Sequence, residues 1–182
     1  MARSLDLGCS PGVAGASMPP MKLAEGLLLA RRAGAELEFE PPSLTVEQGY
    51  AVARELGVLL GEEVGWKVGA TSSPAQAALK TSEPVYGRVF ADGLFGSGDA
   101  VELPGGRDAE AEPEILLRLR RDPGATFSPD DVAEVRLGLE INRPSRSDAL
   151  HLGAGFIVAD NAAHVGLVIG PAIPLSLLGE PE

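Results

Sequence analysis

Glutamates recur at alternate positions near the middle of the chain, in the Glu-Pro-Glu sequence of residues 112–114. On a β-strand, residues two apart point to the same face, so Glu112 and Glu114 would lie side by side. Glu140 occupies the polar face of a second predicted strand, residues 137–141. Neighbouring carboxylates repel unless a charge neutralises them, and Mg²⁺ prefers such oxygen ligands. Spacing alone leaves two interpretations open, a divalent-metal site or the solvated outer faces of half-buried strands.

A lysine stands in a glycine-flanked predicted strand, in the sequence Gly-Trp-Lys-Val-Gly-Ala-Thr-Ser of residues 65–72. Lys67, followed by the hydroxyls of Thr71 and Ser72, could hold a small carboxylate. The alternative is a lysine that extends its ammonium to solvent beside a packed Trp66. Both interpretations remain open from these residues alone.

Polar side chains also separate two apolar runs further on, at Asp160 and Asn161. They predict a turn with side-chain to backbone bonds, or alternatively polar groups at the rim of a pocket. The two histidines, His151 and His164, have no partner at a metal-ligand spacing, and we interpret both as structural.

Helix-capping residues and the spacing of apolar residues indicate the helices and strands that position these side chains. Met21 to Gly34 predicts a helix that stops at its glycine, and the Thr45 and Gln48 pair predicts a capping box that opens a second helix to about Leu60. Further predicted elements are strands at residues 64–68, 86–90, 114–121, 137–141, 155–159 and 165–169, with helical turns at 73–79 and from Ser128 to about Val135. Helices followed by a mostly β region indicate the α+β class.

One strand face in this region is cleanly apolar. Pro113, Ile115, Leu117 and Leu119 alternate with the glutamates and their neighbours, so we expect this face to point toward the core.

Composition bounds the remaining possibilities. The chain has 182 residues, 45% of them hydrophobic and 23% charged, with a formal net charge of −11. Such an acidic surface argues against nucleic acid and anionic membranes as partners. The single cysteine, Cys9, excludes an internal disulfide and fits a reducing, cytoplasmic location. We expect a disordered tail over residues 1–20, a helical region over 21–63 and a β-rich region over 64–182.

Several motifs in the same order resemble one branch of a known superfamily. They are residues 65–72, residues 76–90 with Tyr86-Gly87-Arg88-Val89-Phe90, residues 112–119, Glu140-Ile141, and residues 159–170. Together they resemble the 2-keto-4-pentenoate hydratase and 2-oxo-3-hexenedioate decarboxylase branch of the fumarylacetoacetate hydrolase superfamily. The likeness runs from about Met21 to Pro171.

The resemblance implies a mixed β-sandwich or roll preceded by a small helical region. It implies Mg²⁺ or Mn²⁺ held by Glu112, Glu114 and Glu140, and a short unsaturated 2-oxo acid as substrate. Lys67 corresponds to an active-site lysine that binds the substrate carboxylate or transfers a proton. Thr71, Ser72, Asp160 and Asn161 correspond to the surroundings of the pocket, and family members assemble into oligomers, so a homo-oligomer is expected.

The chain departs from the family pattern in three places. The usual E-I-x-D-S-R sequence reads Glu-Ile-Asn-Arg-Pro-Ser-Arg at residues 140–146, and Val85 replaces an acidic residue found in some members. The chain also ends at Glu182, where family members continue with further strands, so we expect the front portion of an incomplete sandwich. Three functions remain open: a hydratase used in aromatic catabolism, the related decarboxylase, and a truncated non-catalytic homologue. Acylpyruvate hydrolysis fits less well, because no suitably placed histidine precedes Lys67.

Overall fold

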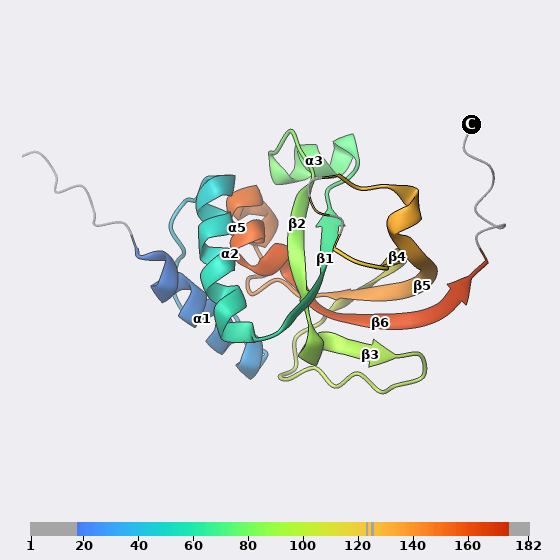
Figure 1. Cartoon of the computed structure of the whole chain (residues 1–182). Helices are drawn as coiled ribbons and strands as arrows, with labels where there is room; N and C mark the ends of the chain where they lie inside the picture. The colour runs from blue at the N-terminus through green and yellow to red at the C-terminus, as the bar shows by residue number, and fades with distance from the viewer. Residues whose placement is uncertain (1–17, 123, 125, 175–182) are drawn as a thin grey trace, which may run out of the picture.

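The computed structural model describes residues 18–122, 124 and 126–174, and its helices and mixed sheets confirm the α+β class. The N-terminal helices lie on one side of the molecule and the four-stranded sheet on the other, with the two-stranded sheet between them (Figure 1). The predicted tail falls almost entirely outside the described residues, as do Cys9 and the end of the chain. In the part of the chain that is described, no helix is both long and apolar enough to cross a lipid bilayer.

The two predicted N-terminal helices are present. Helix α1 spans Pro20–Ala33 and ends at Gly34, whose φ of 60° is a left-handed conformation that glycine adopts without strain. Helix α2 spans Val46–Leu60, and its Thr45 and Gln48 form the predicted capping box. Both helices bury an aliphatic stripe, as expected for amphipathic helices on a core.

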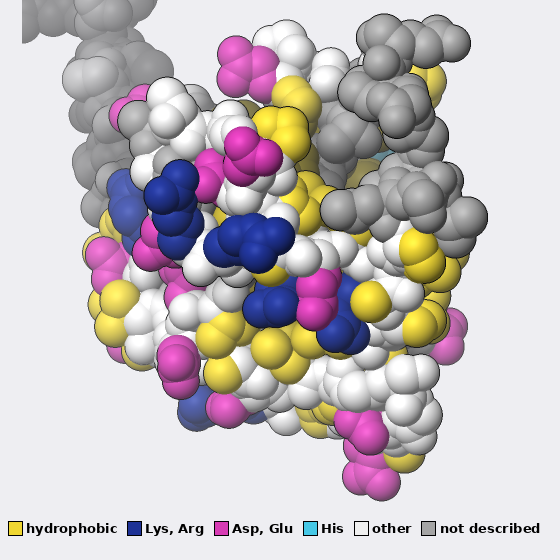
Figure 2. Space-filling model, turned by 45° about the vertical axis from the view of Figure 1, so that its right-hand side comes forward, with side chains coloured by type: hydrophobic (Ala, Val, Ile, Leu, Met, Phe, Trp, Pro, Cys, Tyr) yellow, Lys and Arg dark blue, Asp and Glu magenta, His cyan; other side chains and the backbone are white. Residues whose placement is uncertain are grey.

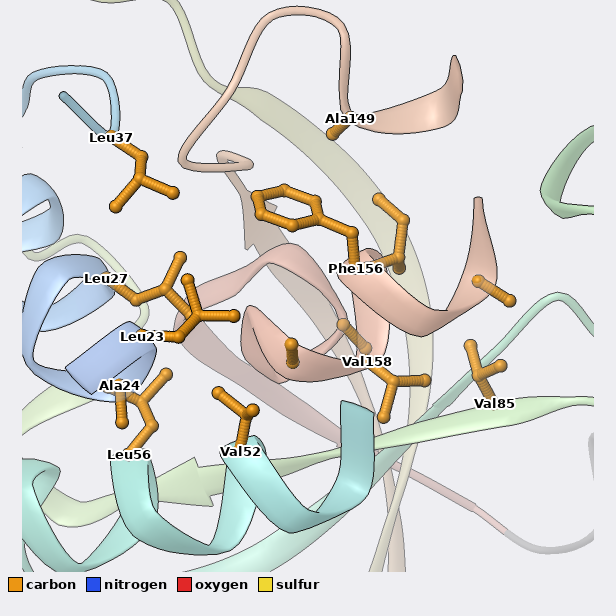
Figure 3. Close-up of a cluster of buried hydrophobic side chains, with 14 of the residues drawn as sticks. Leu23, Ala24, Leu27, Leu37, Val52, Leu56, Val85, Ala149, Phe156 and Val158 are labelled. Atoms are coloured by element: carbon orange, nitrogen blue, oxygen red, sulfur yellow. The ribbon is translucent and has the colours of Figure 1, made fainter. Parts of the chain in front are cut away.

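The main core joins these helices to a third one. Helix α5, Ala154–Ala159, has every residue buried and packs against α2. Leucines 23, 27 and 56 meet Phe156 and Val158 in this cluster (Figure 3). At Gly49 the two helices come so close that an added Cβ would lie 2.2 Å from the Gly155 carbonyl oxygen. The core therefore combines residues from both of the regions that the sequence predicts.

The strands form two sheets. Strands β1 (Glu63–Gly69) and β2 (Val85–Phe90) pair antiparallel, and the short helix α3 (Ser73–Leu79) connects them. The second sheet has the order β3-β6-β5-β4, with bounds Leu94–Gly96, His164–Ile173, Val132–Asn142 and Glu110–Leu119. Strand β3 runs parallel to β6, and the other neighbours are antiparallel. Helix α4, Ala149–Leu152, precedes α5.

Two predicted elements are wrong. Residues 155–159, predicted as a strand, belong to helix α5, because a short run of apolar residues buried on all sides has no periodicity that separates helix from strand. The predicted helix from Ser128 to Val135 is a single 3-10 turn, Pro129–Asp131, capped by Ser128. Strand β5 begins directly afterwards at Val132, because pairing with β4 outweighs the local helix-start signal.

The expected burial of the apolar face of β4 is also wrong. Ile115 and Leu117 are 55% and 51% exposed, and on the neighbouring strand Leu137 and Leu139 are 48% and 42% exposed. Figure 2 brings forward the side of the molecule that carries β4 to β6, where hydrophobic side chains reach the surface between charged ones. Val135 and Ile141, at the two ends of the same face of β5, are buried, so the exposure is confined to the middle of this face. We call Ile115, Leu117, Leu137 and Leu139 the apolar sheet face.

Candidate metal centre

The three glutamates selected from the sequence meet on the opposite face of the same sheet. Glu112 on β4 lies directly across from Glu140 on β5, and Glu114 lies across from Gly138. One carboxylate oxygen from each of the three lies within 4.8 Å of the others. The structure thus brings them together as the strand pattern predicts, while their binding of a metal ion stays a prediction.

Glu140 is the buried member of the cluster and has two partners. Its Oε1 lies 3.1 Å from Lys67 Nζ and 2.7 Å from His164 Nδ1. Lys67 reaches it because alternate residues of β1 point inward, and its side chain is only 14% exposed. The alternative interpretation, a solvent-directed lysine beside a packed tryptophan, does not match this arrangement, because Trp66 is 57% exposed while Lys67 contacts Glu140.

The charges of these partners decide the ionisation of Glu140. Burial alone would raise its pKa, but the hydrogen bond with His164 and the ammonium of Lys67 outweigh burial and lower the pKa. Glu140 is therefore an anion at neutral pH, held in a fixed orientation by two contacts to one of its oxygens.

The pKa of Glu114 is shifted in the opposite direction, upward. Its partial burial raises its pKa, and the neighbouring charges of Glu140 and Glu112 raise it further, against a smaller lowering by Lys67. A carboxylate in this position gains from a nearby cation, because a cation relieves both the repulsion and the cost of burial.

The donor set fits a hard divalent cation. Three carboxylates with one ammonium leave the cluster net negative, and all of the available ligand atoms are oxygens. Glu140 is buried, Glu114 is intermediate and Glu112 is exposed. Such a gradient provides one fixed ligand and leaves a side open to water or substrate, which is how Mg²⁺ is commonly bound.

His164 is the residue of this site that sequence reasoning missed. It stands 24 residues after Glu140, and only the pairing of His164 with Asn142 across β5 and β6 brings the ring to the carboxylate. Its Nε2 is buried without a hydrogen-bond partner among the described residues. No motif marks this contact, so the sequence offers no signal for it.

Thr71 and Ser72 follow β1 and lie at the start of α3. The Ser72 hydroxyl accepts a hydrogen bond from the Ala75 amide and caps the helix, while Thr71 is exposed. Within the described part of the chain, neither residue is hydrogen-bonded to the glutamate cluster. Their contact with a substrate stays a prediction.

Asp160 and Asn161 lie in the interior and hold elements together. Asp160 is fully buried, and its Oδ1 accepts hydrogen bonds from Arg31 Nε at 3.0 Å and Ser145 Oγ at 2.9 Å. Asn161 bonds both the amide and the carbonyl of Arg88, at 2.7 and 2.8 Å. The structure does not bring them to the glutamates, and their contact with substrate stays a prediction.

Comparisons with known proteins agree with the resemblance seen in the motifs. The chain is 32% identical over 106 residues to a 2-keto-4-pentenoate hydratase of Paraburkholderia xenovorans (strain LB400), covering 54% of this chain and 39% of that protein. It is 35% identical over 114 residues to a 2-hydroxyhexa-2,4-dienoate hydratase of Comamonas testosteroni, covering 58% and 43%. No protein-family model matches the chain.

Solved structures show the same fold. The 4-oxalocrotonate decarboxylase from Pseudomonas putida G7 complexed with calcium and acetate matches with a TM-score of 0.71 at 21% identity, over 87% of this chain and 64% of that one. The same enzyme complexed with magnesium and adipate matches with a TM-score of 0.65 at 20% identity, over 87% and 65%. The resemblance to this branch of the superfamily is confirmed, and the matches span about two fifths of the length of the curated relatives.

Proposed function

We propose that this chain carries the site of a metal-dependent lyase, a hydratase that adds water to a short unsaturated 2-oxo acid such as 2-keto-4-pentenoate. The observation that carries the proposal is the cluster of Glu112, Glu114 and Glu140, whose carboxylate oxygens lie within 4.8 Å of one another. The curated relatives are hydratases, and the solved relatives are complexed with magnesium or calcium.

In this proposal Glu112, Glu114 and Glu140 hold Mg²⁺ or Mn²⁺. The bound cation would supply Lewis-acid stabilisation of negative charge on substrate oxygens. Lys67 keeps Glu140 in position through its 3.1 Å contact, and its ammonium places a positive charge beside the cluster that would attract a substrate carboxylate. His164 contacts the same oxygen of Glu140, and the exposed Glu112 leaves one side of the cluster open to the substrate.

Decarboxylation of a 2-oxo acid is the second candidate. It is favoured by the likeness of the fold to 4-oxalocrotonate decarboxylase over 87% of this chain. Both reactions would use the same glutamates, so the identity of the product separates them. A third candidate, a non-catalytic homologue, predicts metal binding without turnover.

The first experiment measures the metal site directly, by titrating the purified chain with Mn²⁺ and following the free ion by electron paramagnetic resonance. We expect Glu114→Gln to weaken Mn²⁺ binding about tenfold or more, because a charged ligand is lost. Glu110→Gln is the matched control, since Glu110 lies on the same strand outside the cluster. Equal binding by the wild type and the Glu114 variant would refute the metal site.

The second experiment tests the reaction. The absorbance of 2-hydroxypenta-2,4-dienoate is followed with Mg²⁺ and with EDTA, and CO₂ release is measured on 2-oxo-3-hexenedioate. Metal-dependent loss of the dienoate that Lys67→Met suppresses would support the hydratase. Release of CO₂ without hydration would favour the decarboxylase instead.

A further inference from the structure

A cavity of about 310 Å³ is lined by none of the three glutamates and not by Lys67, and its volume suits a small organic molecule. Its wall brings together the C-terminal ends of α1 and α2, the end of β2, strand β3, the loop around residue 103 and the start of β6. Much of this wall is apolar, formed by Leu28, Leu60, Phe90, Phe95, Leu103 and Val165.

The cavity also contains a buried cation. Arg143 is 4% exposed, and within the described residues it forms no ion pair. Its recorded side-chain hydrogen bond is from Nη1 to the Pro104 carbonyl oxygen, at 2.8 Å. A guanidinium has five N–H donors and stays charged in proteins, so a single neutral acceptor compensates it poorly.

The surroundings of Arg143 further disfavour its positive charge. Burial lowers its pKa, and the charges of Arg107 and Arg31 lower it further. Those two neighbours have carboxylate partners of their own, because Arg31 lies 3.0 Å from Asp160 and Arg107 lies 3.5 Å from Glu36. The acidic residues that line the cavity, Asp92 and Glu102, are exposed side chains and are not paired with Arg143.

We propose that this cavity binds a small organic carboxylate, with its anionic end at Arg143 and its apolar body against Phe90 and Phe95. The buried, unpaired guanidinium supplies the charge, and the apolar wall favours a hydrocarbon chain or ring over a bare inorganic anion. The site also reaches the glutamate cluster, because His164 lines the cavity and bonds Glu140 through Nδ1.

The test uses isothermal titration of the whole chain with hexanoate, in EDTA so that no metal contributes. Hexanamide is the neutral probe of matched size, and inorganic phosphate is an anion without a hydrocarbon chain. We expect hexanoate to bind about tenfold or more tightly than hexanamide, because a charge-assisted hydrogen bond is lost in the amide. Equal binding of acid and amide, or tighter binding of phosphate than of hexanoate, would overturn the proposal.

Variants locate the binding. Arg143→Gln should remove the preference for the acid, whereas Lys67→Met should retain it, since Lys67 is absent from the cavity wall. If the Arg143 variant does not fold, Leu103→Trp provides the second test, because it fills the cavity from its loop while Arg143 is kept. A preference for the acid that survives in a folded Arg143 variant, hexanoate binding that is unchanged in the Leu103 variant, or a preference that disappears only in Lys67→Met would assign hexanoate to another site and refute the proposal.

Discussion

At the scale of single residues, the site depends on a buried anion with two partners. A lone carboxylate in the interior would become protonated, but Lys67 and His164 keep Glu140 ionised. The ionised carboxylate can then bind a cation without first losing a proton. The alternate spacing of glutamates predicts the carboxylates, because a strand has a fixed period of two.

The partners of those carboxylates were less predictable. The contacts of His164 with Glu140 and of Arg143 with the Pro104 carbonyl join elements distant in sequence, and no local pattern encodes such contacts. For Asp160 the sequence leaves a turn and a pocket rim open, and the fold buries the side chain against Arg31 and Ser145. A sequence motif thus predicts the chemistry of a side chain more securely than it predicts which residues will surround that side chain.

Lys67→Met tests the pairing of Glu140. The change keeps the length of the side chain and removes its charge, so Glu140 retains His164 alone. We expect a loss of about 1–3 kcal/mol in the free energy of unfolding in EDTA, below the ~3–5 kcal/mol of a fully uncompensated buried charge. Mg²⁺ should restore part of this loss, because it replaces the missing positive charge.

The measurement is urea denaturation with EDTA and with Mg²⁺. Lys22→Met is the control, since Lys22 is an exposed residue of α1 and does not belong to the glutamate cluster. An identical loss in both buffers would show that Lys67 has a packing role only.

At the scale of elements, β4 and β5 are held in register by cross-strand charges as well as by backbone bonds. Glu134 on β5 lies opposite Arg118 on β4, and it also contacts Arg136. Hydrogen bonds from Arg118 and Arg136 lower the pKa of Glu134 from 4.5 to about 2. A depressed carboxyl pKa stabilises the fold above the unfolded pKa, and this contribution is lost as pH falls from about 4.5 to about 2.

Glu134→Gln should therefore make the chain less sensitive to acid. We expect its urea midpoint to change less between pH 5 and pH 3 than that of the wild type, and the difference to be small because the pair is near the surface. A wild-type midpoint that falls no more steeply than the variant's over this range would contradict the pairing.

Strand β2 also depends on a close approach to the turn that carries Asn161. Residues Asn161, Ala162 and Ala163 all have positive φ, and Asn161 is bonded to Arg88. An added Cβ at Gly87 would lie 2.6 Å from the Asn161 carbonyl oxygen. Gly87→Ala should thus destabilise the chain by about 1–3 kcal/mol, the usual cost of overpacking.

Gly106→Ala is the matched control for this measurement of the free energy of unfolding, because nothing lies within 4 Å of a Cβ there.

The sequence predicts a turn at Asp160 and Asn161, but it does not predict the backbone conformation of that turn. Sequence reasoning was most successful for α1 and α2, whose caps are local, and it failed at α5, whose helical form depends on packing against α2.

At the scale of the whole molecule, the two faces of the four-stranded sheet have different environments. One face carries the glutamate cluster beneath β1, and the other carries the apolar sheet face of Ile115, Leu117, Leu137 and Leu139. Exposed groups of this kind commonly mark surfaces that another chain or segment covers. The proposed metal site would then lie on a sheet whose opposite face is partly exposed and less rigidly supported, so we expect any turnover by the chain alone to be slow.

The same exposure predicts self-association of the purified chain. In sedimentation velocity the wild type should contain species larger than a monomer, increasing with concentration, because contact would bury the apolar sheet face. The double change Ile115→Lys and Leu137→Lys should shift the chain toward the monomer with little change in melting temperature, since both side chains are already about half exposed. Val58→Lys is the control, because Val58 is 77% exposed on α2, away from this face. A wild type that remains monomeric at high concentration, or a double variant that associates equally, would show that this face is not the contact.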